Sequence, residues 1–161
     1  RDTFFRKCCK CLFWHFHYTT HGIEVSFFYA KSRTCSFIVD QLIYQINHSY
    51  ANNCYDAAAV LMRRLFEVLL VLSYQNNGID DQIKDSTGKG YIMLDGIVKN
   101  AKNNQILKIS RIKSEFDTFR MVGNFSAHNI TYTAGKKDID DIKLNYRVML
   151  EELYSKAGLT T

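Results

Sequence analysis

The sequence predicts an all-α protein, a bundle of four to five helices with a small β-hairpin appendage at its N-terminus. Beyond residue 35, apolar residues recur at spacings of three and four, which is the period of a helix with one buried face. Before that point the pattern alternates, as it does along a strand with two different faces. We therefore expect a hairpin appendage over residues 1–35 and a helical domain over residues 36–161.

Length and composition are those of one globular domain. The chain has 161 residues, 47% of them hydrophobic and 23% charged, and no apolar run reaches the roughly 18 residues that a bilayer span requires. Its five cysteines are an odd number, which argues against a complete disulfide framework. We expect a cytoplasmic protein that does not enter a membrane. The net charge of +5 favours an anionic partner such as RNA.

The N-terminal appendage is dense in aromatic residues. Two alternating runs, residues 13–18 and 23–29, flank the segment Thr19-Thr20-His21-Gly22. This arrangement is typical of a β-hairpin. A lone hairpin is only marginally stable in water, so we expect it to pack on the helical domain.

Cysteine and histidine residues of the appendage resemble part of a zinc site. Cys8 and Cys11 have the spacing with which a zinc ribbon begins, but the second Cys-x2-Cys pair is missing. Cys35 and one hairpin histidine would have to supply the other ligands. Free thiols are the favoured interpretation, and a zinc ion held by Cys8, Cys11 and Cys35 is the alternative. No other cofactor is expected.

The first two predicted helices span residues 36–50 and 54–75. The first places one apolar stripe inward, formed by Val39, Ile43, Ile46 and Tyr50. The second is apolar nearly all round, so we expect it to be buried nearly all round. Charged residues that interrupt it include Arg63, Arg64 and Glu67. They form either an i,i+4 Arg63–Glu67 pair at the solvent edge or a polar stripe that faces a later helix, and the pattern leaves both open.

Three further helices complete the predicted domain. A polar connector over residues 78–90 leads to a helix over 91–103, whose inward positions are Leu94, Ile97, Val98 and Ala101. The next helix covers residues 110–129, and its core-facing positions are Ile112, Phe116 and Phe119. The last helix begins near Asp138, an N-cap candidate, and ends before Gly158.

The helix over residues 110–129 carries the most informative polar residues. Arg120, Asn124 and His128 follow one another at i, i+4 and i+8, so they drift only about 80° around the axis and can share one side. Gly123 lies among them and costs about 1 kcal/mol of helix propensity relative to alanine. A glycine here indicates the close approach of another backbone or a slight kink.

Two segments together resemble the HEPN superfamily. Residues 55–67 carry the pattern AAxxLxRxxxE, and residues 120–128 end in GNxxAH. The chain is most similar to bacterial, uncharacterised HEPN-like domains that have both patterns, and the resemblance covers about residues 36–157. It implies a helical bundle, often a homodimer, in which the signature residues of both subunits converge in a cleft. It also implies a metal-independent endoribonuclease of a toxin–antitoxin or antiphage defence system, with RNA and a protein of that system as partners.

The HEPN signature is an arginine followed by a polar residue, three further residues and a histidine. Asn124 and His128 fit this spacing, whereas Gly123 stands where the arginine is expected. Arg120 lies one turn earlier on the same side, so its long side chain is the candidate for the displaced cation.

The chemistry that the resemblance implies is transesterification of RNA. His128 would transfer protons, because an imidazole titrates near neutrality. Arg120 would hold the phosphate, and Asn124 would orient the histidine or the phosphate. The residues that would support them are Arg63, Arg64 and Glu67.

A second interpretation needs no catalysis. Asn124 would bond a neighbouring helix, and His128 would meet the terminal carbonyls of its own helix. The chain would then be a non-catalytic HEPN-like module for dimerisation, nucleic-acid binding or regulation. Metal-independent RNA cleavage separates the two interpretations.

Overall fold

Five α-helices build the part of the chain that the structure, a computed structural model, describes: residues 31–109 and 112–159. Within these ranges there is no strand, so the all-α prediction is confirmed for them. The helices are α1 (Lys31–Ala51), α2 (Tyr55–Asn76), α3 (Leu94–Asn103), α4 (Phe116–His128) and α5 (Lys136–Lys156). Two short 3₁₀ helices, η1 (Asp80–Ile83) and η2 (Lys113–Glu115), lie in the connections. The predicted hairpin and its cysteines Cys8 and Cys11 fall outside the described residues.

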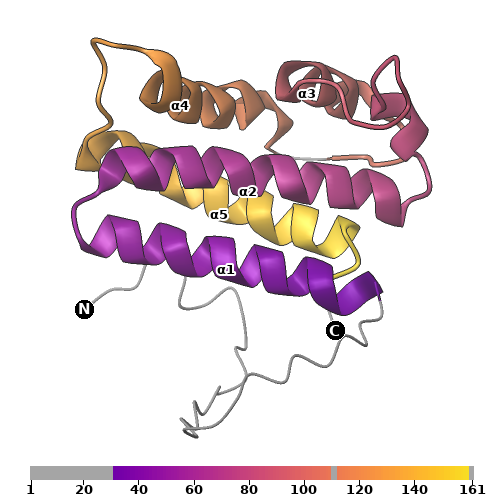
Figure 1. The fold of residues 1–161 in the computed structure, drawn as a ribbon, viewed down its shortest axis with the longest axis horizontal. Helices are drawn as coiled ribbons and strands as arrows, with labels where there is room; N and C mark the ends of the chain where they lie inside the picture. Colours follow the sequence, from indigo (N-terminus) through magenta and orange to yellow (C-terminus); the bar gives the residue numbers. More distant parts are fainter. Residues whose placement is uncertain (1–30, 110–111, 160–161) are drawn as a thin grey trace, which may run out of the picture.

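The most apolar helix, α2, lies at the centre of the bundle. It packs against α1 on one side, α4 on the other and α5 behind (Figure 1). Its buried face is formed by Ala58, Ala59, Met62, Leu65, Phe66, Leu69, Leu70, Ser73 and Tyr74. The expectation that α2 is buried nearly all round is wrong for one stripe, because Ala57, Arg64 and Gln75 are exposed. No helix covers the front of α2 in Figure 1, so the bundle leaves one side of this helix open.

An aromatic cluster joins α2, α4 and α5. The Phe66 ring meets Phe116 edge to face with 4.9 Å between centroids, and Phe119 meets Tyr146 in the same way at 5.4 Å. The buried Tyr146 hydroxyl donates a hydrogen bond to the backbone carbonyl of Met62, 2.6 Å away. Burial raises the pKa of Tyr146 well above its ordinary value, so this hydroxyl keeps its proton. The cluster therefore fixes α4 and α5 against the central helix.

The inward stripes predicted from periodicity are the buried ones. In α3 all four predicted positions are buried, and Phe116 and Phe119 of α4 are buried as well. Val39 and Ile46 of α1 are fully buried, whereas the other two predicted positions, Ile43 and Tyr50, are partly buried against the same core. The 3.6-residue period sufficed because each of these helices buries one face against a neighbour.

Four predicted helix starts are corrected, those of α1, α3, α4 and α5. The first helix begins at Lys31 and not at residue 36, so Cys35 belongs to α1 and not to the appendage. The fourth begins at Phe116, because η2 precedes it. Asp138 is not the N-cap of α5. Gly135 holds that position with extended backbone, and Asp138 accepts the Gly135 N–H from the first turn at 2.8 Å.

The polar connector predicted between the second and third helices is an ordered loop with hydrogen bonds of its own. Its ends are paired, since Ile92 N–H donates to the Ile83 carbonyl at 2.9 Å. At the tip, Asp85 accepts hydrogen bonds from the backbone N–H and the hydroxyl of Thr87, at 2.9 and 2.6 Å. These bonds, the hydroxyl first, lower the pKa of Asp85. The loop delays the start of α3 from residue 91 to Leu94.

Among the described helices, none combines the length and the apolar character that crossing a bilayer requires. This holds for α2 as well, although it is the most apolar of them.

Candidate functional site

The contact between α2 and α4 is closest at Gly123. A Cβ atom added there would lie 2.3 Å from the Cβ of Arg63 and 2.9 Å from the carbonyl oxygen of Ala59. Both distances are below ordinary van der Waals contact. The predicted close approach of another backbone is thus confirmed, and Gly123 allows it because it has no side chain.

Arg63 of α2 also joins the two helices by polar contacts at this point. Its Nε donates a hydrogen bond to Oδ1 of Asn124 at 2.6 Å, and its Nη1 lies 3.6 Å from Oε2 of Glu67. The side chains of Arg63 and Glu67 keep 25% and 27% of their surface exposed. Both predicted arrangements of these charges therefore occur together. The i,i+4 pair forms, and it also faces α4.

His128 is the last residue of α4 and its side chain is exposed. Within the described part of the chain it makes no hydrogen bond or ion pair. The last turn is closed instead by Asn129, whose N–H donates to the Phe125 carbonyl at 3.0 Å. His128 lines an open depression together with Asn124, Phe125, Asn129 and Ile130. The two residues that fit the HEPN signature thus share one surface.

Arg120 points to a different neighbour. Its Nη2 lies 3.4 Å from Oδ1 of Asp95 in α3 and 4.0 Å from Oδ1 of Asp117. Its Nε is buried without a hydrogen-bond partner. The structure therefore brings Arg63, and not Arg120, into contact with Asn124. A catalytic part for Arg120 stays a prediction.

Sequence reasoning missed Asp95, which holds Arg120. The sequence contained a signal for an ion pair at Asp95, because this residue lies four positions before Lys99 on a predicted helix. The two side chains do form an ion pair, at 2.7 Å. The pKa of Asp95 is lowered first by Lys99 and then by the charges of Arg120 and Lys102. Lys102 also bonds Asp117, so cations and carboxylates alternate between α3 and α4. This network of ion pairs joins α3 to α4.

Arg64 follows Arg63 but lies on the open stripe of α2. Its side chain is exposed, and no ion pair or hydrogen bond engages it among the residues described. It is free to meet an anion in solution, although it does not touch Asn124 or Glu67 as Arg63 does.

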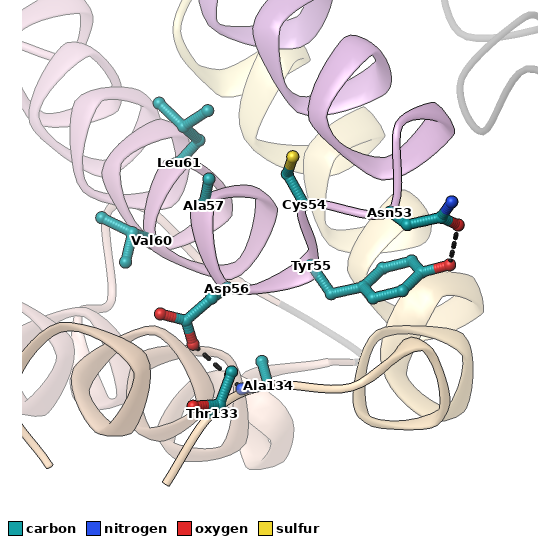
Figure 2. A pocket seen from close by; sticks show the side chains of 9 residues that line it. All are labelled: Asn53, Cys54, Tyr55, Asp56, Ala57, Val60, Leu61, Thr133 and Ala134. Carbon is teal, nitrogen blue, oxygen red and sulfur yellow. Dashed lines mark hydrogen bonds between the residues drawn. The ribbon is translucent and has the colours of Figure 1, made fainter. Parts of the chain in front are cut away.

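A second depression lies at the start of α2, where the segment after α4 passes over it (Figure 2). Asp56 points across it, and its Oδ1 accepts the N–H of Ala134 at 2.9 Å. The Tyr55 hydroxyl turns to Asn53 and donates to its Oδ1 at 2.6 Å. The polar groups are thus bonded to each other and do not converge on a ligand. Asp56 instead fixes the connection between α4 and α5.

In the two ranges that the structure describes, no group of three or more histidine, cysteine or acidic side chains could hold a metal ion. The zinc alternative depends on Cys8 and Cys11, which lie outside these ranges. It therefore stays a prediction.

Comparison of the chain with protein-family models, with curated proteins and with solved structures finds no match. The resemblance to the HEPN superfamily consequently rests on the two sequence patterns, in α2 and α4.

Proposed function

We propose that this chain is a HEPN-type, metal-independent endoribonuclease of a bacterial toxin or antiphage defence system. One observation carries the proposal: the exposed His128 shares a surface with Asn124, whose amide oxygen is held by a partly exposed arginine. An imidazole can transfer protons, and a guanidinium and an amide can stabilise a phosphate, so these three groups are suited to cleavage of a phosphodiester without a metal.

The reaction is an attack of the ribose 2′-oxygen on the adjacent phosphorus. The new P–O bond closes a 2′,3′-cyclic phosphate, and the bond from phosphorus to the 5′-oxygen breaks. The imidazole of His128, which is exposed to solvent, accepts the proton of the 2′-hydroxyl.

Arg63 is the cation that best fits the phosphate. A guanidinium has five N–H donors. Arg63 directs Nε to Asn124 and Nη1 to Glu67, which leaves Nη2 for a phosphate oxygen. Glu67 holds the guanidinium in place, and Asn124, whose Oδ1 accepts from Arg63, lines the same depression as His128. Arg63 would thus do from α2 what an arginine at position 123 would do from α4.

A second copy would complete the site. One imidazole cannot at the same moment take the proton of the 2′-hydroxyl and give one to the leaving 5′-oxygen. The surface beside His128 exposes three large apolar side chains, Met121, Phe125 and Ile130. Burying them between two copies is favourable and would bring two His128 side chains near one scissile phosphate.

The decisive test is cleavage of single-stranded RNA by the full chain in EDTA. We expect cleavage with cyclic-phosphate ends, and a loss of at least about 100-fold in His128→Ala, the range for removing a general base. His48→Ala is the matched control, because His48 is an exposed histidine on α1, away from the site. Equal cleavage by His128→Ala and the unchanged protein would refute the assignment.

The non-catalytic interpretation has an observation of its own. The bond between Arg63 and Asn124 also serves as a clamp between α2 and α4. If the unchanged protein binds RNA at low salt but does not cleave it, the chain is a binding module. If it does neither, only a role in protein interaction is left.

A further inference from the structure

The outer face of α1 carries a row of large apolar side chains. Phe37, Tyr44 and Ile38 expose 61%, 64% and 46% of their surface. Phe37, Gln41, Tyr44 and His48 follow at spacings of four, three and four, so they form one line along the helix. Tyr44 and His48 stack with 6.0 Å between ring centroids and 18° between ring planes. The stripe formed by this line therefore has aromatic rings at Phe37 and Tyr44, with the His48 imidazole stacked on Tyr44 and polar Gln41 between the two rings. Ile38 lies beside the stripe, about 100° around the helix from Phe37.

The opposite face of α1 is already used. Val39 and Ile46 are fully buried, and α1 packs on α2. Because α1 forms the edge of the bundle in Figure 1, no described helix lies beyond the stripe. Single exposed apolar residues are common on protein surfaces, whereas exposed aromatic side chains aligned on one helix favour a contact surface.

We propose that residues 1–30 of this chain dock on the outer face of α1. Nine of these residues are aromatic: Phe4, Phe5, Phe13, Trp14, Phe16, Tyr18, Phe27, Phe28 and Tyr29. Residue 30 joins directly to Lys31, the first residue of α1. Phe37 lies only about 9 Å along the helix from that junction. A segment tethered so closely meets the stripe at an effective concentration of the order of millimolar.

The dimensions of the two partners agree. From Phe37 to His48 the stripe is about 16 Å long, at 1.5 Å per helical residue. A strand of five residues spans about the same length. The alternating runs 13–18 and 23–29 are each long enough to cover the stripe. A two-stranded hairpin gains independent stability by packing one apolar face on a helix, and α1 offers such a face.

The tether decides between this occupant and a second copy of the chain. A second copy must bear the loss of translational and rotational freedom, whereas residues 1–30 are already at the site. The docked segment also leaves the His128 surface open, since α1 and α4 lie on opposite sides of α2 (Figure 1). The inference is therefore independent of the proposed ribonuclease activity.

The chain provides its own reporter, because Trp14 is its single tryptophan and lies in the docking segment. In the full chain we expect blue-shifted Trp14 emission and weak quenching by acrylamide. The double variant Phe37→Gln/Tyr44→Gln keeps helix propensity and removes the aromatic stripe. We expect it to shift the emission to the red and to raise the quenching constant several-fold, while far-UV circular dichroism of the bundle is retained.

Met93→Gln is the matched control, because Met93 is 83% exposed just before α3, and it should leave Trp14 unchanged. Two outcomes overturn the proposal. One is a Trp14 as accessible in the unchanged protein as in a free tryptophan amide, and the other is a double variant with the same quenching as the unchanged protein. A dimer in size-exclusion chromatography that the double variant loses, with Trp14 unaffected, assigns the stripe to a second copy and equally overturns it.

Discussion

At the scale of single residues, Gly123 decides where the cation of the site comes from. Any side chain at this position would collide with Arg63 and with the backbone of Ala59. An arginine here, as the HEPN signature has it, would force α4 away from α2. With glycine, α4 approaches so closely that Arg63 of α2 reaches Asn124. The glycine at position 123 and the contact of Arg63 with Asn124 thus belong to one packing contact.

Gly123→Ala should destabilise the protein, although alanine favours the helix by about 1 kcal/mol. Its Cβ would meet atoms next to the backbone of α2, which cannot turn away, so we expect a net loss of about 1 to 3 kcal/mol in the free energy of unfolding. Urea denaturation measures it. In the control Gly96→Ala, the added Cβ would meet the flexible end of Ile92, which can rotate. Equal stability of Gly123→Ala and the unchanged protein would contradict the packing contact.

Asp140 is a second residue on which several contacts converge. It accepts a hydrogen bond from the Tyr50 hydroxyl of α1 at 2.5 Å and pairs with Lys136 and Lys143 at 2.6 and 2.9 Å. The Lys136 bond first, and then those of Tyr50 and Lys143, hold the pKa of Asp140 far below its ordinary value. The same carboxylate raises the pKa of Lys136. This is a polar contact between α1 and α5.

The depressed pKa of Asp140 predicts a stability that falls in acid. A carboxyl group titrates near 3.9 in the unfolded chain. Because its pKa is lower in the folded state, the contribution is full above that value and is lost as the pH falls from about 5 toward the folded pKa. We expect Asp140→Asn to flatten the decrease in unfolding free energy below pH 5. The exposed neighbour is the control, and Asp141→Asn should keep the full acid dependence.

At the scale of elements, the position of His128 depends on how α4 ends. The connection from α4 to α5 begins with Asn129, whose side-chain oxygen accepts the N–H and the hydroxyl of Thr131 at 2.9 and 2.8 Å. It ends with the bond from Ala134 to Asp56, in the first turn of α2. The end of α4 is therefore held from both sides, while the His128 side chain stays free in solvent.

Asp56→Ala should release that connection. The buried N–H of Ala134 would lose its acceptor, at a cost of about 1 to 3 kcal/mol. We expect faster hydrogen exchange of the Ala134 amide and weaker RNA cleavage with the helices intact. Asp56→Asn keeps an oxygen acceptor and should retain most of the protection. Protection of Ala134 that does not change in Asp56→Ala would show that the bond does not hold the segment.

At the scale of the whole molecule, the net charge of +5 favours RNA without naming a binding face. The structure makes α3 and α5 poor candidates for the RNA-binding face, because most of their described cations are paired with carboxylates. Arg63 and Arg64 lie side by side on α2, one beside the depression that His128 lines and one on the open stripe. We expect RNA to cross this front of the molecule.

Arg64→Gln should therefore weaken RNA binding without loss of stability. One phosphate contact fewer reduces the slope of log K against log salt by about 0.7 for a single strand. Gel shifts over a range of salt concentrations measure the slope. Arg147→Gln on α5 is the control, because that arginine is paired with Glu151 at 3.7 Å. A slope that is the same in Arg64→Gln and the unchanged protein would exclude Arg64 from the RNA contact.

The sequence by itself determined the all-α class of the described residues, the number of helices and their inward faces. Those properties are local, because a period of 3.6 residues can be counted along the chain. All four inward positions of α3 were found in this way. Helix starts were less accessible, since η2 and the Gly135 cap depend on the neighbouring segments and not on periodicity.

Only the tertiary structure decided which polar residues meet. Helical spacing placed Arg120, Asn124 and His128 on one side, but a side about 80° wide faces more than one neighbour. Arg120 lies against Asp95 of α3, Asn124 bonds Arg63 of α2, and His128 meets solvent. The angle around a helix follows from its own sequence, whereas the partner at that angle is set by how the other helices pack.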